Sequence, residues 1–141
     1  MTKLIAGLVL LLIFPVAGGA QNLPTASRNP DSDWYRAFDI RFNPGQADEA
    51  IQIAADHFEP VDQALGREVL GFVHESGEWD QTVYIPMDGP GEMVWNVSPI
   101  DEEWWARLAE QEGGAEQAMA VFASYTSKVA DYRVTIVRRP H

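Results

Sequence analysis

Six side chains with charged, acid–base or phenolic chemistry stand near the ends of segments that have the pattern of β-strands. Asp39 and Arg41 lie near the end of one such segment, and His74 ends another. Guanidinium and imidazole groups close to a tyrosine would suit a small anionic or carbonyl-bearing ligand, because they donate hydrogen bonds to its oxygens. The sequence therefore predicts a ligand-binding site made of these side chains: Asp39, Arg41, His74, Asp80, Tyr84 and Arg133.

The same residue types also fit an arrangement without any ligand. Arginines and aspartates that face each other on neighbouring strands form cross-strand ion pairs, which help to fix the register of a sheet and add little stability. The sequence favours this ladder of ion pairs over a ligand site but leaves both interpretations open.

His74 is the candidate catalytic residue. In an enzyme it would transfer a proton, while Arg41 or Arg133 steadied an oxyanion. The histidines do not form a metal-ligand pair, because neither His57 nor His74 has a second histidine three or four residues away. We predict no metal and no cofactor.

The composition is that of one globular domain. The chain has 141 residues, of which 46% are hydrophobic and 22% charged. It contains no cysteine, which excludes disulfides, thiolate nucleophiles and cysteine-based zinc sites. Twenty-one acidic against 10 basic residues give a net charge of −11, and this acidic balance argues against a nucleic-acid partner.

The first residues have the pattern of a secretory signal peptide. Lys3 precedes an apolar run over 4–14, and Pro15 is followed by small residues up to Ala20. The alternative, an uncleaved membrane anchor, would need about 20 apolar residues, and this run is shorter. The sequence predicts a signal peptide at 1–20, a polar tether at 21–33 and one domain at 34–141. The expected location is secreted or periplasmic, with no membrane attachment after cleavage.

Hydrophobic periodicity divides the remaining chain into strands and helices. Side chains of 34–42 and 131–139 have the two-residue period of a strand, and 68–74 and 79–85 are short runs rich in β-forming residues, and together these patterns indicate four strands. Helical spacing runs from Ala47 to Leu65, with Pro60 expected to kink or split the helix. A second helical region starts near Asp101 and is interrupted by Gly113 and Gly114.

This order predicts an α+β fold of the ferredoxin-like βαββαβ type, with the second helix split in two. Its antiparallel four-stranded sheet has the order 4-1-3-2, so the first and last strands are neighbours. The alternative is a general α+β domain with a fifth strand at Glu92–Val97.

Several turn motifs resemble those of NIPSNAP-type members of the dimeric α/β barrel group. Asn43-Pro44-Gly45 ends the first strand, Ala64-Leu65-Gly66 ends the first helix, and Leu70-Gly71-Phe72 precedes Glu75-Ser76-Gly77. The resemblance implies two ferredoxin-like subunits packed sheet against sheet, with a cavity between helices and sheet that often holds a small organic ligand or heme. It implies a small-ligand binding or interaction module, or alternatively a cofactor-independent monooxygenase or isomerase. Whether the chain is an enzyme stays open.

The second face of the sheet is expected to be covered by another copy of the chain. Helices cover one face of such a sheet, and a face exposed only to water should be mostly polar. Both faces of the predicted hairpin carry large apolar side chains, among them Leu70, Phe72 and Tyr84. The sequence therefore predicts a homodimer, and the alternative is an apolar surface that water simply tolerates.

The charges are also segregated along the chain. Between Gly45 and Ser127 there are 17 acidic residues and only two basic ones, Arg67 and Arg107. The other basic residues of the domain lie in or beside the first and last strands. We expect an anionic helical layer and a sheet whose centre is locally cationic.

Overall fold

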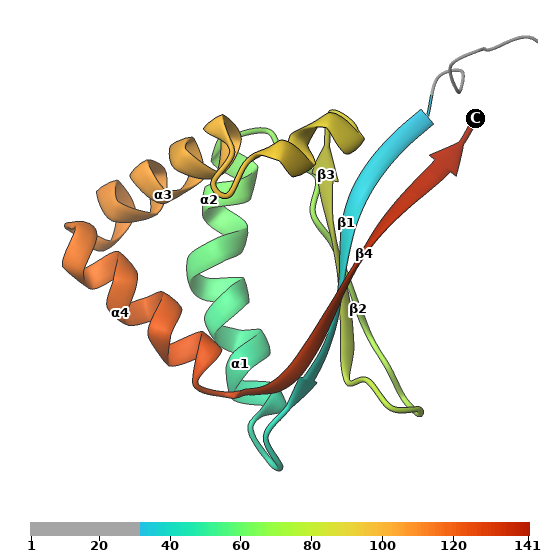
Figure 1. Cartoon of the computed structure of the whole chain (residues 1–141). Helices are drawn as coiled ribbons and strands as arrows, with labels where there is room; N and C mark the ends of the chain where they lie inside the picture. Colours follow the sequence, from blue (N-terminus) through green and yellow to red (C-terminus); the bar gives the residue numbers. More distant parts are fainter. Residues whose placement is uncertain (1–31) are drawn as a thin grey trace, which may run out of the picture.

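The computed structural model describes residues 32–141, in which all helices lie on one side of a four-stranded antiparallel sheet (Figure 1). The predicted signal peptide at 1–20 and residues 21–31 of the predicted tether lie outside the described residues. No helix within residues 32–141 combines the length and the apolar character that crossing a bilayer requires.

The sheet has the predicted order. It consists of β1 (Ser32–Phe42), β2 (Leu70–Val73), β3 (Gln81–Met87) and β4 (Val129–Pro140). The order is β2-β3-β1-β4 and all neighbours are antiparallel, which confirms the ferredoxin-like arrangement with the first and last strands side by side. β1 begins two residues before the predicted strand, because Asp33 pairs with Arg139 and Ser32 with Pro140.

The first helical region widens locally where the sequence predicts a kink. It runs through α1 (Ala47–Ile53), a π-helical turn (Ala54–Phe58) and α2 (Glu59–Ala64). Pro60 has no N–H to donate, and its ring would clash with the carbonyl four residues earlier in a regular helix. The wider π-turn lies directly before this proline and absorbs the mismatch, so the helix continues to Ala64.

The alternative prediction of a fifth strand at Glu92–Val97 is wrong. Residues Pro90–Val94 form a 3-10 helix instead, with Pro90 at its first position. The carboxylate of Glu92 accepts a hydrogen bond from the backbone N–H of Asp88, which closes the turn locally. The backbone N–H groups of Glu92 and Trp95 bond to carbonyls three residues earlier, and the segment does not pair with the sheet.

The second helical region is split as predicted. α3 (Pro99–Glu112) begins at Ser98, whose hydroxyl accepts a hydrogen bond from the N–H of Asp101, while the Asp101 carboxylate accepts one from the N–H of Ser98. Gly113 ends α3 with a φ of +86°, a left-handed conformation that favours glycine. α4 (Ala115–Thr126) follows and leads back to β4.

Two small buried clusters hold these layers together. Ile40, Phe42 and Ala50 join β1 to α1 near one end of the sheet. Val61, Leu108 and Ala118 join α2, α3 and α4 to one another, away from the sheet. Because the second cluster holds helices against helices, part of the helix layer does not rest directly on the strands.

Candidate functional site

The strand register assigns side chains to the two faces of the sheet. Directly paired residues in an antiparallel sheet point to the same side. Phe38 pairs with Val83 and Val134 on the side of the helices, whereas Asp39 pairs with Thr82 and Arg133 on the opposite side. We call this opposite side, which no helix of residues 32–141 covers, the open face.

Three of the six predicted site residues meet on the open face. Thr82 Oγ1 donates a hydrogen bond of 2.6 Å to Asp39 Oδ1, and Arg133 donates two to Asp39 Oδ2, at 2.6 and 3.1 Å. His74 Nε2 lies 2.8 Å from Thr82 Oγ1. The hydroxyl has one proton, which Asp39 accepts, so the imidazole donates to the hydroxyl oxygen. We call Asp39, His74, Thr82 and Arg133 the strand-end cluster.

Arg41 lies beside the strand-end cluster and has its own acidic partner. Its Nη2 donates a 3.2 Å hydrogen bond to Asp131 Oδ2. The guanidinium carbons of Arg41 and Arg133 lie 6.0 and 5.3 Å from the ring centre of Trp79. Trp79 therefore connects the two arginines through cation–π contacts.

Asp80 and Tyr84 have other partners. Asp80 Oδ2 accepts a 2.7 Å hydrogen bond from the backbone N–H of Phe42, which fastens the start of β3 to the end of β1. The ring of Tyr84 lies between Tyr35 and Phe72, with centroid distances of 6.2 and 5.9 Å. Tyr84 thus belongs to an aromatic group on the open face, which we call the aromatic triad: Tyr35, Phe72 and Tyr84.

The hydrogen bonds of the strand-end cluster stabilise the ionised form of its carboxylate. The pKa of Asp39 is lowered, first by the hydrogen bond from Thr82 and next by the one from Arg133. Its side chain is only 15% exposed, and both of its oxygens already have partners. The arrangement is that of the predicted ladder of ion pairs, and a ligand-binding role for these residues stays a prediction.

On the other side of the sheet, a cavity of about 400 Å³ lies between the strands and the helices. Its wall is mostly aromatic and aliphatic, with Phe38 and Val83 from the sheet and Phe58, Trp104, Trp105 and Tyr125 from the helices. This helix–sheet cavity is in the size range of about 300–1,000 Å³ that is usual for small-molecule sites. It forms because the helices pack on one another and only partly on the sheet.

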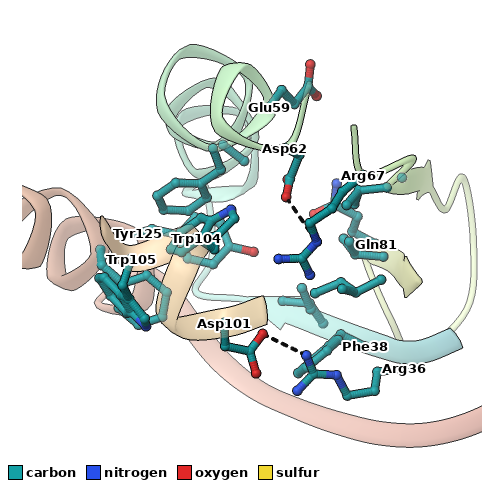
Figure 2. A pocket seen from close by; sticks show the side chains of 18 of the residues that line it. Arg36, Phe38, Glu59, Asp62, Arg67, Gln81, Asp101, Trp104, Trp105 and Tyr125 are labelled. Carbon is teal, nitrogen blue, oxygen red and sulfur yellow. Dashed lines mark hydrogen bonds and ion pairs between the residues drawn. The ribbon is translucent and has the colours of Figure 1, made fainter. Parts of the chain in front are cut away.

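Two arginines enter the cavity from different elements (Figure 2). Arg36, on β1, donates a 2.9 Å hydrogen bond to Asp101 Oδ1 at the start of α3. Arg67 follows the end of α2 and has only a loose ion pair, 3.7 Å from its Nε to Asp62 Oδ1. Arg36 is thus neutralised by a hydrogen-bonded carboxylate, whereas Arg67 is not.

Burial changes the acid–base properties of three cavity groups. It raises the pKa of Asp62 in spite of the opposing effects of Arg67 and Trp104. It also acts to raise the pKa of Asp101, but hydrogen bonds from Arg36 and Ser98 outweigh it and the pKa is lowered. Burial alone raises the pKa of Tyr125 to about 12, so its phenol is neutral and can donate a hydrogen bond.

The sequence did not indicate the polar groups of the cavity, nor Thr82 and Trp79 on the open face. Arg67 had one signal, since it is one of two basic residues in a stretch that holds 17 acidic ones. Within the described residues, no group of three or more histidine, aspartate or glutamate side chains is placed to hold a metal ion.

Comparison with known proteins supports the fold. Neither a protein-family model nor a curated protein matches the sequence. A NIPSNAP family protein from Agrobacterium tumefaciens strain C58 matches with a TM-score of 0.53 and 13% identity, over 83% of this chain and 92% of its own. A NIPSNAP family protein of unknown function from the same organism matches with a TM-score of 0.52 and 16% identity, over 77% and 89%. The chain therefore has the ferredoxin-like fold of NIPSNAP family proteins, which confirms the predicted resemblance at the level of the fold.

The strand-end cluster makes a prediction about stability and pH. We expect Asp39→Asn to lower the free energy of unfolding at pH 7 by about 1 kcal/mol, because Arg133 loses its charged acceptor. The folded pKa of Asp39 lies below the reference value of 3.8, so its contribution is present above that pH and is lost as the pH falls through the folded pKa. Urea unfolding at neutral and acidic pH measures this difference.

The matched control is Asp131→Asn, which removes the carboxylate of the exposed Arg41 pair and should change stability by less than about 0.5 kcal/mol. A destabilisation by Asp39→Asn that was equally large at both pH values would contradict the assigned role of the carboxylate.

Proposed function

We propose that this chain is a small-ligand binding module whose ligand lies in the helix–sheet cavity. The observation that carries the proposal is a space of about 400 Å³ with an apolar wall and a few polar groups at one side. Such a combination buries the body of a small organic molecule and orients it through a few hydrogen bonds. The apolar run after Lys3 supports export to the periplasm or to the outside of the cell.

The cavity is a better candidate than the strand-end cluster because of where free hydrogen-bonding capacity lies. Asp39 and Arg133 already satisfy each other, so a ligand on the open face would have to replace an existing ion pair. In the cavity, the Nε of Arg67 is buried and has no hydrogen-bond partner among the described residues. Ligand binding by Asp39, Arg41, His74, Asp80, Tyr84 and Arg133 stays a prediction.

The alternative function, a cofactor-independent monooxygenase or isomerase, depends on His74. A proton-transfer group needs to reach its substrate in a site that excludes water. His74 is exposed and lies on the open face, on the other side of the sheet from the cavity. The single subunit therefore offers no specific support for this alternative.

We also infer that a second copy of the chain covers the open face. Phe72 of the aromatic triad is 56% exposed there. Beside it the charges alternate in sign, with Asp39 next to Arg133 and Asp131 next to Arg41. Because such a patch has no excess of positive or negative charge, it can pack against the same patch of a second copy across a twofold axis. Two copies of the anionic helix layer would instead repel each other.

Ligand binding in the cavity is tested with a neutral probe, N-phenyl-1-naphthylamine, whose fluorescence rises in apolar surroundings. We expect saturable binding to the full chain and its loss in Gly71→Leu. Gly71 lines the cavity, and a Cβ there would meet only an ordinary contact of 3.6 Å with Gln81, so a leucine fills the space without a backbone clash.

Gly91→Leu is the matched control, because it adds the same side chain where nothing lies within 4 Å and outside the cavity. It should bind the probe as the unchanged protein does. Absence of saturable binding to the unchanged protein, or full binding to a folded Gly71→Leu, would reject the cavity as the site.

The dimer is tested by sedimentation equilibrium. We expect Phe72→Glu to weaken self-association by at least about tenfold, since a carboxylate would be buried against an apolar surface of the partner. Met119→Glu is the control, because Met119 on α4 is equally exposed at 56% and lies on the helix layer. A monomeric unchanged protein, or equal effects of both substitutions, would contradict the proposed interface.

A further inference from the structure

Arg36 and Arg67 both line the cavity with a buried Nε that has no hydrogen-bond partner among the described residues, but only Arg36 is hydrogen-bonded to a carboxylate through another nitrogen. The side chain of Arg67 is only 8% exposed, and its Nε is buried without a hydrogen-bond partner among the described residues. The nearest carboxylate oxygen, of Asp62, is 3.7 Å from this nitrogen, which is beyond hydrogen-bond distance. A guanidinium has five N–H donors, and leaving them unpaired in a buried site is costly. Arg67 therefore has a buried N–H donor for which residues 32–141 provide no acceptor.

Two more polar side chains line the same space without a hydrogen-bond partner in residues 32–141. Gln81 on β3 is 8% exposed, and Tyr125 on α4 presents its neutral phenol. Figure 2 shows Arg67 reaching into the cavity, with Gln81 on its own side and Trp104 and Tyr125 across from it. The three polar groups offer mainly hydrogen-bond donors, with Arg67 and Gln81 on one side of the cavity and the Tyr125 phenol within the aromatic wall opposite.

The charges around the cavity favour a ligand with a single negative charge. The other arginine, Arg36, is already bound to Asp101. Asp62 stands beside Arg67, its Oδ1 3.7 Å from the arginine Nε, and burial raises the pKa of its carboxyl. A dianion such as a phosphate monoester would leave its second charge unpaired, and a cation would meet the guanidinium.

We propose that the helix–sheet cavity binds a small organic acid, with the carboxylate on the guanidinium of Arg67 and the apolar body against the aromatic wall. The inference rests on the proposed ligand-binding function and adds the chemical class of the ligand. A planar carboxylate matches the planar guanidinium and can accept two parallel hydrogen bonds from it. Tyr125 donates a further hydrogen bond, and Phe38, Trp104 and Trp105 cover the body of the ligand.

Isothermal titration calorimetry on the full chain tests the inference with three probes. The probes are 2-naphthoate, its neutral isostere 2-naphthamide, and decanoate. We expect 2-naphthoate to bind at least about tenfold more tightly than 2-naphthamide, because only the acid offers a charged acceptor to the guanidinium. Decanoate distinguishes an aromatic acid from a fatty acid as the ligand. Because the aromatic wall favours a planar body, we expect decanoate to bind more weakly than 2-naphthoate.

The matched variants are Arg67→Met and Arg107→Met. Methionine keeps an apolar stem in the cavity and removes the charge. Arg67→Met should therefore lose the preference for the acid over the amide, whereas Arg107→Met, at an exposed ion pair with Glu110, should keep it. If Arg67→Met does not fold, the comparison of acid and amide on the unchanged protein decides the matter alone.

The possible failures are distinguishable. If neither naphthalene compound binds, the cavity is not a ligand site and the proposed function fails together with this inference. If the acid and the amide bind equally well, or if Arg67→Met keeps the preference, the cavity binds ligands but the carboxylate assignment is wrong.

Discussion

The buried guanidinium of Arg67 is the feature on which the functional account depends. Its Nε has no hydrogen-bond partner among the described residues, and its carboxylate neighbour Asp62 stays 3.7 Å away. The packing of the helices explains why this guanidinium is buried without a carboxylate within hydrogen-bond distance. The helices pack through Val61, Leu108 and Ala118 on one another, so they leave a space above the strands that Arg67 enters. A buried charge beside an apolar wall is poorly placed in an empty cavity and well placed in a binding site.

The sheet separates this site from a different kind of surface. On the side of the helices, the buried Nε of Arg67 has no hydrogen-bond partner among the described residues. On the open face the charges are paired, with Asp39 holding both Thr82 and Arg133. Paired charges next to exposed apolar rings suit a protein partner, because the surface is neutral locally and its apolar part gains from burial. The two faces thus fit the two proposed roles, a ligand beneath the helices and a second copy of the chain against the strands.

Local patterns in the sequence explain most of the fold and part of the site. Alternating apolar residues predict β1 as a strand, and Gly113-Gly114 predicts the break between α3 and α4, because each depends on a few adjacent residues. The pairing of β1 with β4 was predicted from the order of the elements, through the ferredoxin-like plan. Antiparallel strands also bring Asp39, His74 and Arg133 together as expected. The alternative of a strand at Glu92–Val97 was wrong, because it followed the apolar content of the segment and neglected Pro90, which starts a 3-10 helix. The family resemblance implied a cavity between helices and sheet, but the place of Arg67 in it could not be predicted. The burial of Arg67 depends on how far the helix layer stands from the sheet, which no local pattern encodes.

The most direct test observes the Arg67 side chain itself, through the ¹H–¹⁵N resonances of arginine Nε–Hε groups in the full chain. Arg67→Met assigns its signal, and the exposed Arg107 serves as the internal reference. The account predicts that 2-naphthoate shifts the Arg67 signal and slows its exchange with water, while the Arg107 signal stays where it is. An Arg67 signal that is unchanged at saturating 2-naphthoate, or that moves no more than the Arg107 signal, would contradict it.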